Sequence, residues 1–195
     1  MNEVVAFEHD GRKRLDGYVR RALDGETAAT RALLEAVWPA AVKSARSVVG
    51  GDEAMVQDVV QDALVRFLDA LPNFRFECSP TTYAARIAFR TGTDHIRRDR
   101  SLRARAQAAS LAEPSRAASL PGDSDGWVVA LLRDALSPIQ AETLMLRAVH
   151  GYSVDEIARA QSAPTETVRS RLRLARQTMR QRIQSDPELS ELVHD

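Results

Sequence analysis

The sequence has little of what disulfide-bonded, metal-binding and membrane proteins require. Its single cysteine, Cys78, excludes an intrachain disulfide and is typical of a reducing compartment. The histidines are too dispersed to complete a zinc site with that cysteine; they are His9, His95, His150 and His194. No apolar run approaches the ~20 residues that span a bilayer, and the first residues lack the pattern of a secretory signal. We therefore expect a cytoplasmic protein with no metal site and no membrane insertion.

The chain also lacks an excess of either charge and any motif of enzymatic chemistry. Basic and acidic residues number 27 each, so a nucleic-acid site would need an uneven placement of charge. We find no glycine-rich phosphate loop, no cluster of metal ligands and no nucleophile paired with a base, and therefore expect neither an enzyme nor a cofactor. The 195 residues are 44% apolar, which is enough to fill the core of one medium domain or two small ones.

The stretch 151–180 has the pattern of two short helices joined by a tight turn. Ser153 and Glu156 have the spacing of a capping box, in which each side chain accepts a backbone N–H. Pro164 and Thr165 are typical of the first turn of a second helix. Two helices in this arrangement predict a helix-turn-helix, a DNA-binding motif.

The second of these helices has an apolar stripe beside a row of arginines. The stripe recurs at steps of four, three and four residues and consists of Val168, Leu172, Ala175 and Met179. The arginines recur at the same steps, at Arg169, Arg173, Arg176 and Arg180. One face therefore packs while its neighbour presents guanidinium groups, which pair with phosphates or contact guanine bidentately in a major groove. A merely solvated face is the alternative, but the capped helix and short turn before it favour DNA binding.

The segment 52–71 predicts an amphipathic helix with Asp52 as its N-cap. Its buried stripe is expected to be Val56, Val60, Ala63, Phe67 and Leu71. Its polar face carries Gln57, Asp58, Gln61, Asp62, Arg66 and Asp69. An ordinary amphipathic helix explains this pattern. A docking surface, whose carboxylates and amides contact a basic partner, is the second interpretation.

A strongly basic segment follows Ser79 and Pro80, which predict the start of another helix. Between Tyr83 and Arg105, seven arginines stand against two aspartates. One face of this helix is expected to carry Arg86, Arg90, Thr93, Arg97 and Arg100. A solvated basic face is one interpretation and nucleic-acid binding is the other. Base stacking on unpaired strands, worth about 1–3 kcal/mol per base, would use the nearby rings of Phe74, Phe76 and Tyr83.

Helical patterns on both sides of one aperiodic stretch predict an all-α fold of two small domains. Residues 27–49 are strongly helical, whereas residues 1–16 show no clear period and are expected to be a loose lead-in. Helices over 127–136 and 137–149 are expected to open the second domain. The predicted division is a first domain at 1–101, a flexible linker at 102–125, a second domain at 126–183 and an acidic tail at 184–195.

With both domains in view, the chain resembles the extracytoplasmic-function (ECF) group of the sigma-70 family, bacterial initiation factors that keep only regions 2 and 4. The motifs close to region 4 are LSP at 136–138, EIA at 156–158 and TVRSRL at 167–172. The motifs similar to region 2 are DVVQDAL at 58–64, RIA at 86–88 and DHIRR at 94–98. Two sets of motifs in this order, separated by a linker, make the resemblance specific.

The resemblance implies a sigma factor, which directs core RNA polymerase to specific promoters and initiates DNA-templated transcription. Docking on core RNA polymerase would use Asp58, Gln61, Asp62 and Leu64. The minus-ten element of promoter DNA would be contacted by Arg86, Arg90, Thr93, Arg97, Arg98 and Arg100. The minus-thirty-five element would be contacted by Thr165, Thr167, Arg169, Ser170, Arg173 and Arg176. An anti-sigma factor is a further partner that the resemblance implies.

The chain departs from the family pattern at a few positions. Tyr83-Ala84 stand where the melting helix usually has Trp-Leu, and Arg90 stands where it usually has Asn. In the turn, Gln161 and Ala163 replace larger apolar residues. A partner-binding regulator without promoter activity would fit the first two departures. A stand-alone helix-turn-helix transcriptional regulator is the other alternative; it would use residues 151–180 alone, would need a dimer, and leaves the motifs of residues 58–100 unexplained.

Overall fold

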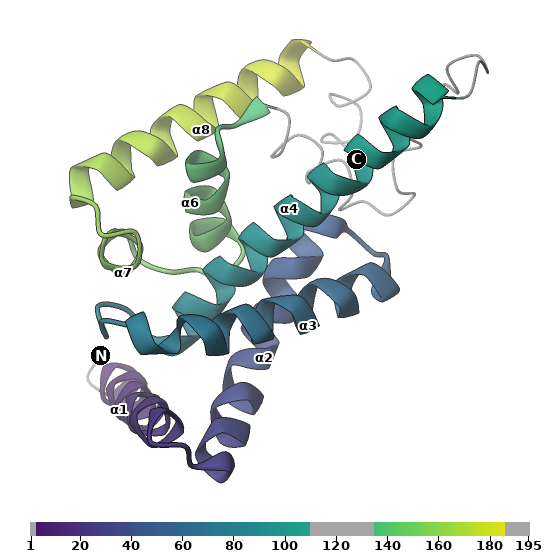
Figure 1. Ribbon diagram of the computed structural model, residues 1–195. Coiled ribbons are helices and arrows are strands. Elements are labelled where there is room, and N and C mark those ends of the chain that lie inside the picture. Colours follow the sequence, from purple (N-terminus) through teal and green to yellow (C-terminus); the bar gives the residue numbers. More distant parts are fainter. Residues whose placement is uncertain (1–2, 110–134, 186–195) are drawn as a thin grey trace.

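The computed structural model describes residues 3–109 and 135–185 (Figure 1). The regular structure in these two ranges is helical, without a strand, which confirms the predicted all-α fold. The first domain consists of α1 (Glu3–Leu23), α2 (Thr27–Val49), α3 (Glu53–Ala70), the 3-10 helix η1 (Leu71–Asn73) and α4 (Pro80–Ala109). The second consists of α6 (Pro138–Ala148), α7 (Val154–Ala160) and α8 (Thr165–Ser185).

The helices of the first domain begin where local capping chemistry predicts. The Asp52 carboxylate accepts a hydrogen bond of 3.1 Å from the Met55 amide at the start of α3. At the start of α4, the Ser79 hydroxyl accepts one of 3.0 Å from the Thr82 amide. The predicted stripe of α3 is buried from Val56 to Leu71, so the polar face of this helix points away from the core.

Helices α2 and α4 cross closely, because small residues line the seam between them. Ala41, Ala45, Ala85 and Ala88 are all buried there. A Cβ atom added to Gly92 would lie 3.2 Å from the Val48 side chain, so even alanine would be crowded at this crossing. The seam holds α4 on the first domain, so that the face of α4 with Ala85 and Ala88 is buried and the other faces of this helix can contact solvent or other elements.

Two boundaries in the first domain differ from those expected. Residues 1–16 were expected to be a loose lead-in, but α1 begins at Glu3 and its Val19 side chain is fully buried in a cluster with Leu33 and Val37. The closely mixed charges of the first turns concealed this period. Helix α4 also continues through Leu102, the start of the predicted linker, to Ala109. Its extension is rich in strong helix formers, and an ion pair of 2.9 Å joins Arg103 to Asp99 one turn earlier.

The second domain contains the predicted helix-turn-helix. The Ser153 amide donates to the Glu156 carboxylate over 2.8 Å, and the Glu156 amide donates back to the Ser153 hydroxyl over 3.2 Å, which confirms the capping box. Gly151 before it adopts a φ of 74°, in the region that favours glycine. Residues 127–134, most of the helix expected over 127–136, and the predicted tail beyond residue 185 lie outside the described residues.

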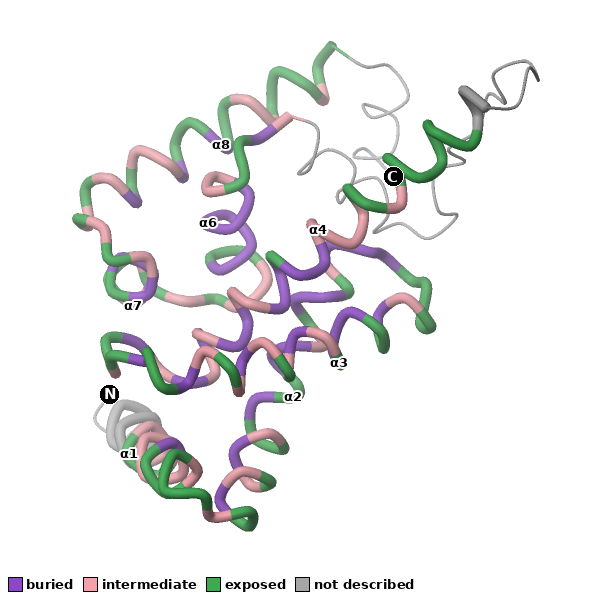
Figure 2. Tube along the Cα trace, viewed as in Figure 1, coloured by how far each residue is buried: buried purple, intermediate pink, exposed green. Residues whose placement is uncertain are grey.

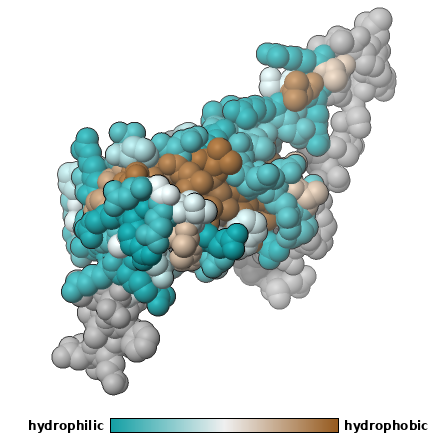
Figure 3. Space-filling view, turned by 60° about the horizontal axis from the view of Figure 1, so that its bottom comes forward, coloured by the Kyte–Doolittle hydropathy of each residue, from teal (hydrophilic) through white to brown (hydrophobic). Residues whose placement is uncertain are grey.

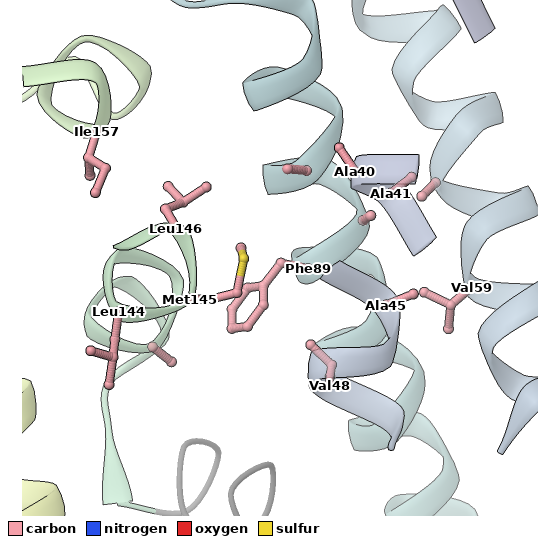
Figure 4. Packing of buried hydrophobic residues seen from close by; sticks show 14 of the residues in the cluster. Ala40, Ala41, Ala45, Val48, Val59, Phe89, Leu144, Met145, Leu146 and Ile157 are labelled. Carbon is pink, nitrogen blue, oxygen red and sulfur yellow. The ribbon is translucent and has the colours of Figure 1, made fainter. Parts of the chain in front are cut away.

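One large hydrophobic cluster contains residues of both domains. Figure 1 shows α6 between α8 and the middle of α4, and Figure 2 shows α6 mostly buried. In Figure 4, the ring of Phe89 of α4 extends toward Met145 of α6, in the same buried cluster. Met145 and Leu146 are 1% and 0% exposed and belong to the same buried cluster as Phe89. The second domain is therefore packed against the first.

Candidate nucleic-acid interfaces

The arginine row of α8 lies on the outer surface of the second domain. Its neighbouring stripe is buried at Val168, Leu172 and Ala175, as predicted, with Met179 packed against the same core. The arginines at 169, 173, 176 and 180 are exposed (Figure 2). Arg169 forms an exposed ion pair of 3.2 Å with Glu166, which contributes little in water. Among the described residues, no side chain pairs with Arg173 or Arg176. This face is available to phosphates and base edges.

The predicted polar residues at the start of α8 lie beside this row. Thr165, Thr167 and Ser170 are half-buried. The Thr165 hydroxyl donates to the Asp155 carboxylate of α7 over 3.4 Å, which ties the two helices of the motif together.

The turn between α7 and α8 is held by a polar network around Gln161. Its side-chain oxygen accepts hydrogen bonds from Arg171 over 2.8 Å and from Thr143 over 3.1 Å. Its amide nitrogen donates to Glu142 over 3.2 Å. The departure from an apolar residue at this position therefore fixes α7 by hydrogen bonds to α6 and α8. Sequence patterns gave no indication of these partners, because they lie on other helices.

The predicted minus-ten face of α4 is divided in two. In its outer part, the side chains of Arg97, Arg98 and Arg100 are exposed, and Arg97 pairs with Asp94 over 3.7 Å. Thr93 donates its hydroxyl to the Arg90 carbonyl over 2.7 Å. The inner part, Arg86 and Arg90, is engaged by the second domain.

The group that engages Arg86 and Arg90 is the Glu142 carboxylate of α6. The Nε atoms of the two arginines donate to its two oxygens over 2.8 Å and 2.6 Å. The Glu142 side chain is 3% exposed, whereas those of Arg86 and Arg90 are 15% and 56% exposed. Burial raises the pKa of Glu142, but the two guanidinium groups lower it by more, so that its pKa lies below the ordinary value. Glu142 is therefore a buried, charged carboxylate, which the sequence patterns did not reveal.

The predicted docking face of α3 is partly open. Asp58 and Gln61 are exposed, and Leu64 is half-buried. Asp62 accepts a hydrogen bond of 3.0 Å from His95 of α4 and pairs with Arg66 over 3.4 Å. The His95 hydrogen bond is the main reason that the pKa of Asp62 is lowered.

An apolar groove adjoins this face between α2 and α3. It has a volume of about 540 Å³ and is lined by Leu34, Trp38 and Leu64 among others. Trp38 is 44% exposed, and Val65, which follows Leu64 in α3, is 55% exposed. Figure 3 views the molecule from the side of α1 and α2, and shows a hydrophobic area framed by hydrophilic residues.

The aromatic residues near α4 pack on one another. The ring centroids of Phe74 lie 4.9 Å from Phe76 and 5.0 Å from Tyr83. Phe74 is buried, so its ring is not open for the base stacking that the sequence allowed. Arg12 donates to the Phe76 carbonyl over 2.9 Å and thereby holds this connector on α1.

The described residues contain no group of three or more side chains that could hold a metal ion. Burial raises the pKa of the Cys78 thiol to about 11, so this thiol is not a nucleophile at neutral pH. No helix within residues 3–109 and 135–185 is both long and apolar enough to cross a bilayer.

Comparison with known proteins identifies both domains. Residues 33–102 match the family model of sigma-70 region 2, and residues 130–179 match that of sigma-70 region 4. The chain is 30% identical over 148 residues to the RNA polymerase sigma-H factor of Pseudomonas aeruginosa, which covers 68% of this chain and 75% of that protein. It is 32% identical over 167 residues to the ECF RNA polymerase sigma factor SigD of Mycobacterium tuberculosis, a match that covers 80% of this chain and 78% of that protein.

Two solved structures share the fold. One is CnrH in complex with the cytosolic domain of CnrY, with a TM-score of 0.59 and 24% identity over 87% of this chain and 96% of that chain. The other is the sigma factor RpoE in complex with the anti-sigma factor NepR from Bartonella quintana, with a TM-score of 0.50 and 22% identity over 80% and 97% of the two chains.

The helical fold, the helix-turn-helix and the two matched regions define a transcription initiation factor. The chain belongs to the sigma-70 family of RNA polymerase sigma factors, within the ECF group. It is a sigma factor for promoter-directed transcription, with core RNA polymerase and promoter DNA as its partners. The family is one of non-catalytic regulatory factors.

Proposed function

We propose that the exposed row of α8 reads the minus-thirty-five element of the promoter as duplex DNA. The observation that supports this role most directly is the exposure of Arg169, Arg173 and Arg176 on a helix seated by a capped partner helix and the Gln161 network. Thr165, Thr167 and Ser170 lie beside them and suit contacts to the phosphate backbone. The α8 face forms the reading surface of a domain over residues 126–183.

We further propose that the α4 face of the first domain, residues 1–101, contacts the minus-ten element while it opens. The outer arginines, Arg97, Arg98 and Arg100, are accessible for this role, with Thr93 half-buried beside them. Arg86 and Arg90 extend the same face toward α6. The linker proposed for residues 102–125 then begins within the last turns of α4.

Core RNA polymerase is proposed to dock on α3 through Asp58, Gln61, Asp62 and Leu64. The exposed carboxylate of Asp58 suits a basic partner, and Leu64 joins this polar face to the groove that contains Trp38. Asp62 also contributes to the structure, because its bond to His95 of α4 and the 3.5 Å ion pair between Arg66 and Asp94 of α4 hold this face on α4. A docking surface with charged and apolar halves provides both orientation and buried area.

The remaining assignments follow from this role. The factor acts in the cytoplasm, where it meets RNA polymerase, and contributes no catalysis of its own. One of the two structural neighbours is the sigma factor RpoE in complex with the anti-sigma factor NepR. An anti-sigma factor is accordingly proposed as a regulatory partner of this chain.

A transcription assay tests the proposal as a whole. The purified chain and bacterial core polymerase are incubated with a pool of genomic promoter fragments, and the initiated transcripts are sequenced. Discrete start sites preceded by a shared two-part motif are expected. Binding of duplex DNA without polymerase, together with an absence of start sites, would instead indicate a stand-alone regulator.

Charge reversal tests the docking face. Asp58→Arg should reduce co-elution with core polymerase, because it places a cation opposite a basic partner, and the helical circular dichroism should be unchanged. Asp24→Arg reverses an equally exposed carboxylate in the turn between α1 and α2 and serves as the control. Equal co-elution of the two variants would contradict the assignment.

A further inference from the structure

Helix α1 carries a basic cluster that none of the surfaces assigned above includes. Between Gly11 and Leu23, five arginine or lysine residues stand against one acidic residue. The match to sigma-70 region 2 begins at residue 33, so α1 lies before the matched residues. A solvated face is the ordinary explanation of such a cluster. The surroundings of α1 decide between this explanation and an anionic partner.

One side of α1 holds the connector, residues 74–79, that leads into α4. Arg12 donates to the Phe76 carbonyl over 2.9 Å, and the guanidinium carbon of Arg20 lies 5.1 Å from the centroid of the Phe76 ring. Phe76 has a φ of 59°, which is uncommon for a residue other than glycine. Two contacts from α1 therefore support the connector in a conformation that is unfavourable by itself.

The cations on this side of α1 are open to solvent. Lys13 and Arg20 are both exposed and lie about two helical turns apart on the same side of the helix. Among the described residues, no carboxylate forms an ion pair with either of them. The one acidic residue of the cluster, Asp16, has its Oδ1 atom buried. The side of α1 that adjoins the connector therefore presents cations to solvent.

The direction of α4 indicates which part of a bound promoter would meet this side of α1. The chain leaves the C-terminal end of α4 toward the second domain, which is proposed to read the upstream element. The N-terminal end of α4 therefore faces downstream, and Figure 1 shows α1 beside this end. The proposed minus-ten face from Arg86 to Arg100 is about 21 Å long, which accommodates about six nucleotides of a DNA strand. Phosphates further downstream would lie beyond this face and next to α1.

We propose that Lys13 and Arg20, with Arg12 beside them, bind the phosphates of the opened promoter strand immediately downstream of the minus-ten element. The inference rests on the proposed contact of α4 with that element. Ammonium and guanidinium groups bind phosphates by charge-assisted hydrogen bonds and without regard to base sequence. The basic side of α1 therefore adds affinity for the opened strand but does not contribute to the choice of promoter.

Contacts of this kind have a characteristic dependence on salt. Each phosphate contact on a single strand changes log K by about 0.7 for a tenfold change in salt concentration. One contact is thus worth about fivefold in affinity at about 0.1 M salt, relative to about 1 M salt. Loss of both Lys13 and Arg20 should reduce the slope of log K against log salt by about 1.4 and weaken binding about 25-fold at about 0.1 M salt.

Two DNA probes test the proposal on the polymerase holoenzyme. Both are fluorescent forked fragments of a promoter recovered in the transcription assay. The short probe ends at the downstream edge of the minus-ten element, and the long probe extends the unpaired strand further downstream. Lys13→Ala with Arg20→Ala should weaken binding of the long probe about 25-fold at about 0.1 M salt and leave binding of the short probe unchanged.

The matched control is Arg14→Ala with Arg21→Ala. Both of these arginines are exposed on the same helix. Each lies one residue beyond Lys13 or Arg20, and therefore about 100° further round the helix, away from the connector. The control should change the binding of neither probe. Equal losses with the two pairs of variants, or no gain in wild-type affinity from the downstream extension, would overturn the proposal.

A failure of the proposed function would look different. If α4 does not contact the minus-ten element, Arg97→Ala with Arg98→Ala should leave binding of the short probe unchanged, whatever the α1 variants do. If these substitutions weaken the short probe while Lys13→Ala with Arg20→Ala leaves the long probe unaffected, the role of α4 stands and that of α1 fails.

Cross-linking provides a test that depends neither on weakened binding nor on the contact between Arg20 and Phe76. A photoreactive benzoylphenylalanine in place of Lys13 should cross-link to nucleotides immediately downstream of the minus-ten element when the holoenzyme binds the long probe. The same group in place of Arg14 should not. Cross-links from position 13 to polymerase alone would show that α1 binds a protein surface, and cross-links to upstream nucleotides would reverse the placement of α1. Either result would overturn the proposal.

Discussion

The arginine faces of α4 and α8 share a sequence pattern but have different surroundings in the folded chain. In α8 the arginines are exposed, and Arg173 and Arg176 have no partner among the described residues. In α4 two of the arginines bind a carboxylate that lies 52 residues beyond Arg90 in the sequence. The difference shows that helical periodicity determines which face is charged, whereas a distant helix determines whether that charge is available.

The largest effect should come from the open face. Arg169→Ala with Arg173→Ala should weaken binding of the polymerase holoenzyme to the upstream promoter element by about 1–3 kcal/mol for each lost base contact. Competition binding on fragments with and without the minus-thirty-five element measures this difference. Unaltered discrimination between the two fragments would show that α8 does not read the element. The exposed Arg46, outside all proposed surfaces, provides a matched alanine control.

A smaller effect on folding should distinguish the two faces. Arg86→Ala leaves Glu142 buried with one guanidinium group and should lower the free energy of unfolding by about 2–3 kcal/mol. Arg173→Ala removes an exposed side chain and should change it by less than about 0.5 kcal/mol. Urea denaturation of the full chain measures both values. Similar losses for the two variants would mean that the Glu142 pair contributes no more than a surface arginine.

The smallest effect should appear with acid. Burial, reinforced by Lys43, lowers the pKa of His150 to about 4 from 6.5, beside Ser44 and the stacked ring of Tyr152. The unfolded chain therefore binds a proton at this site between about pH 6.5 and pH 4 that the folded chain does not, so stability falls as the pH falls through this window. The loss from His150 should be about 1–2 kcal/mol, since the ring is partly exposed.

His150→Asn should flatten the dependence of the urea midpoint on pH in that window, while Asp24→Asn, in an exposed turn, should leave it unchanged. If the wild type and His150→Asn showed the same dependence of the urea midpoint on pH, the His150 ring would be more accessible to solvent than the structure shows.

Local chemistry made the helices of the chain predictable. Asp52, Ser79 and Ser153 cap helices at the expected positions, and α2 has the bounds that its composition predicts. The prediction of a loose lead-in was wrong because the closely mixed charges of residues 1–16 concealed the helical period of α1. Short-range patterns identify an element readily when charged and apolar residues are well separated, and the first turns of α1 interleave them.

The candidate surfaces were predictable as faces but not as contacts. The burial of Glu142 could not be foreseen from the sequence. Helix α6 is apolar on several sides, and the single acidic residue within it would ordinarily be assigned to the solvent-exposed side. The bonds from Asp62 to His95 and from Gln161 to Arg171 likewise join different helices. Such pairings depend on tertiary packing, which a single sequence does not encode in its periodicity.

The narrow seam between α2 and α4 has a mechanical consequence. Alanines and Gly92 bring the two backbones close together, and the Val48 side chain packs directly over Gly92. The first domain should therefore move as one rigid piece, and any hinge of the molecule lies outside it. In native-state hydrogen exchange, α2 and the inner half of α4 should open together in one cooperative unit, later than α6. The α4 face of the first domain would thus keep its shape when it contacts promoter DNA.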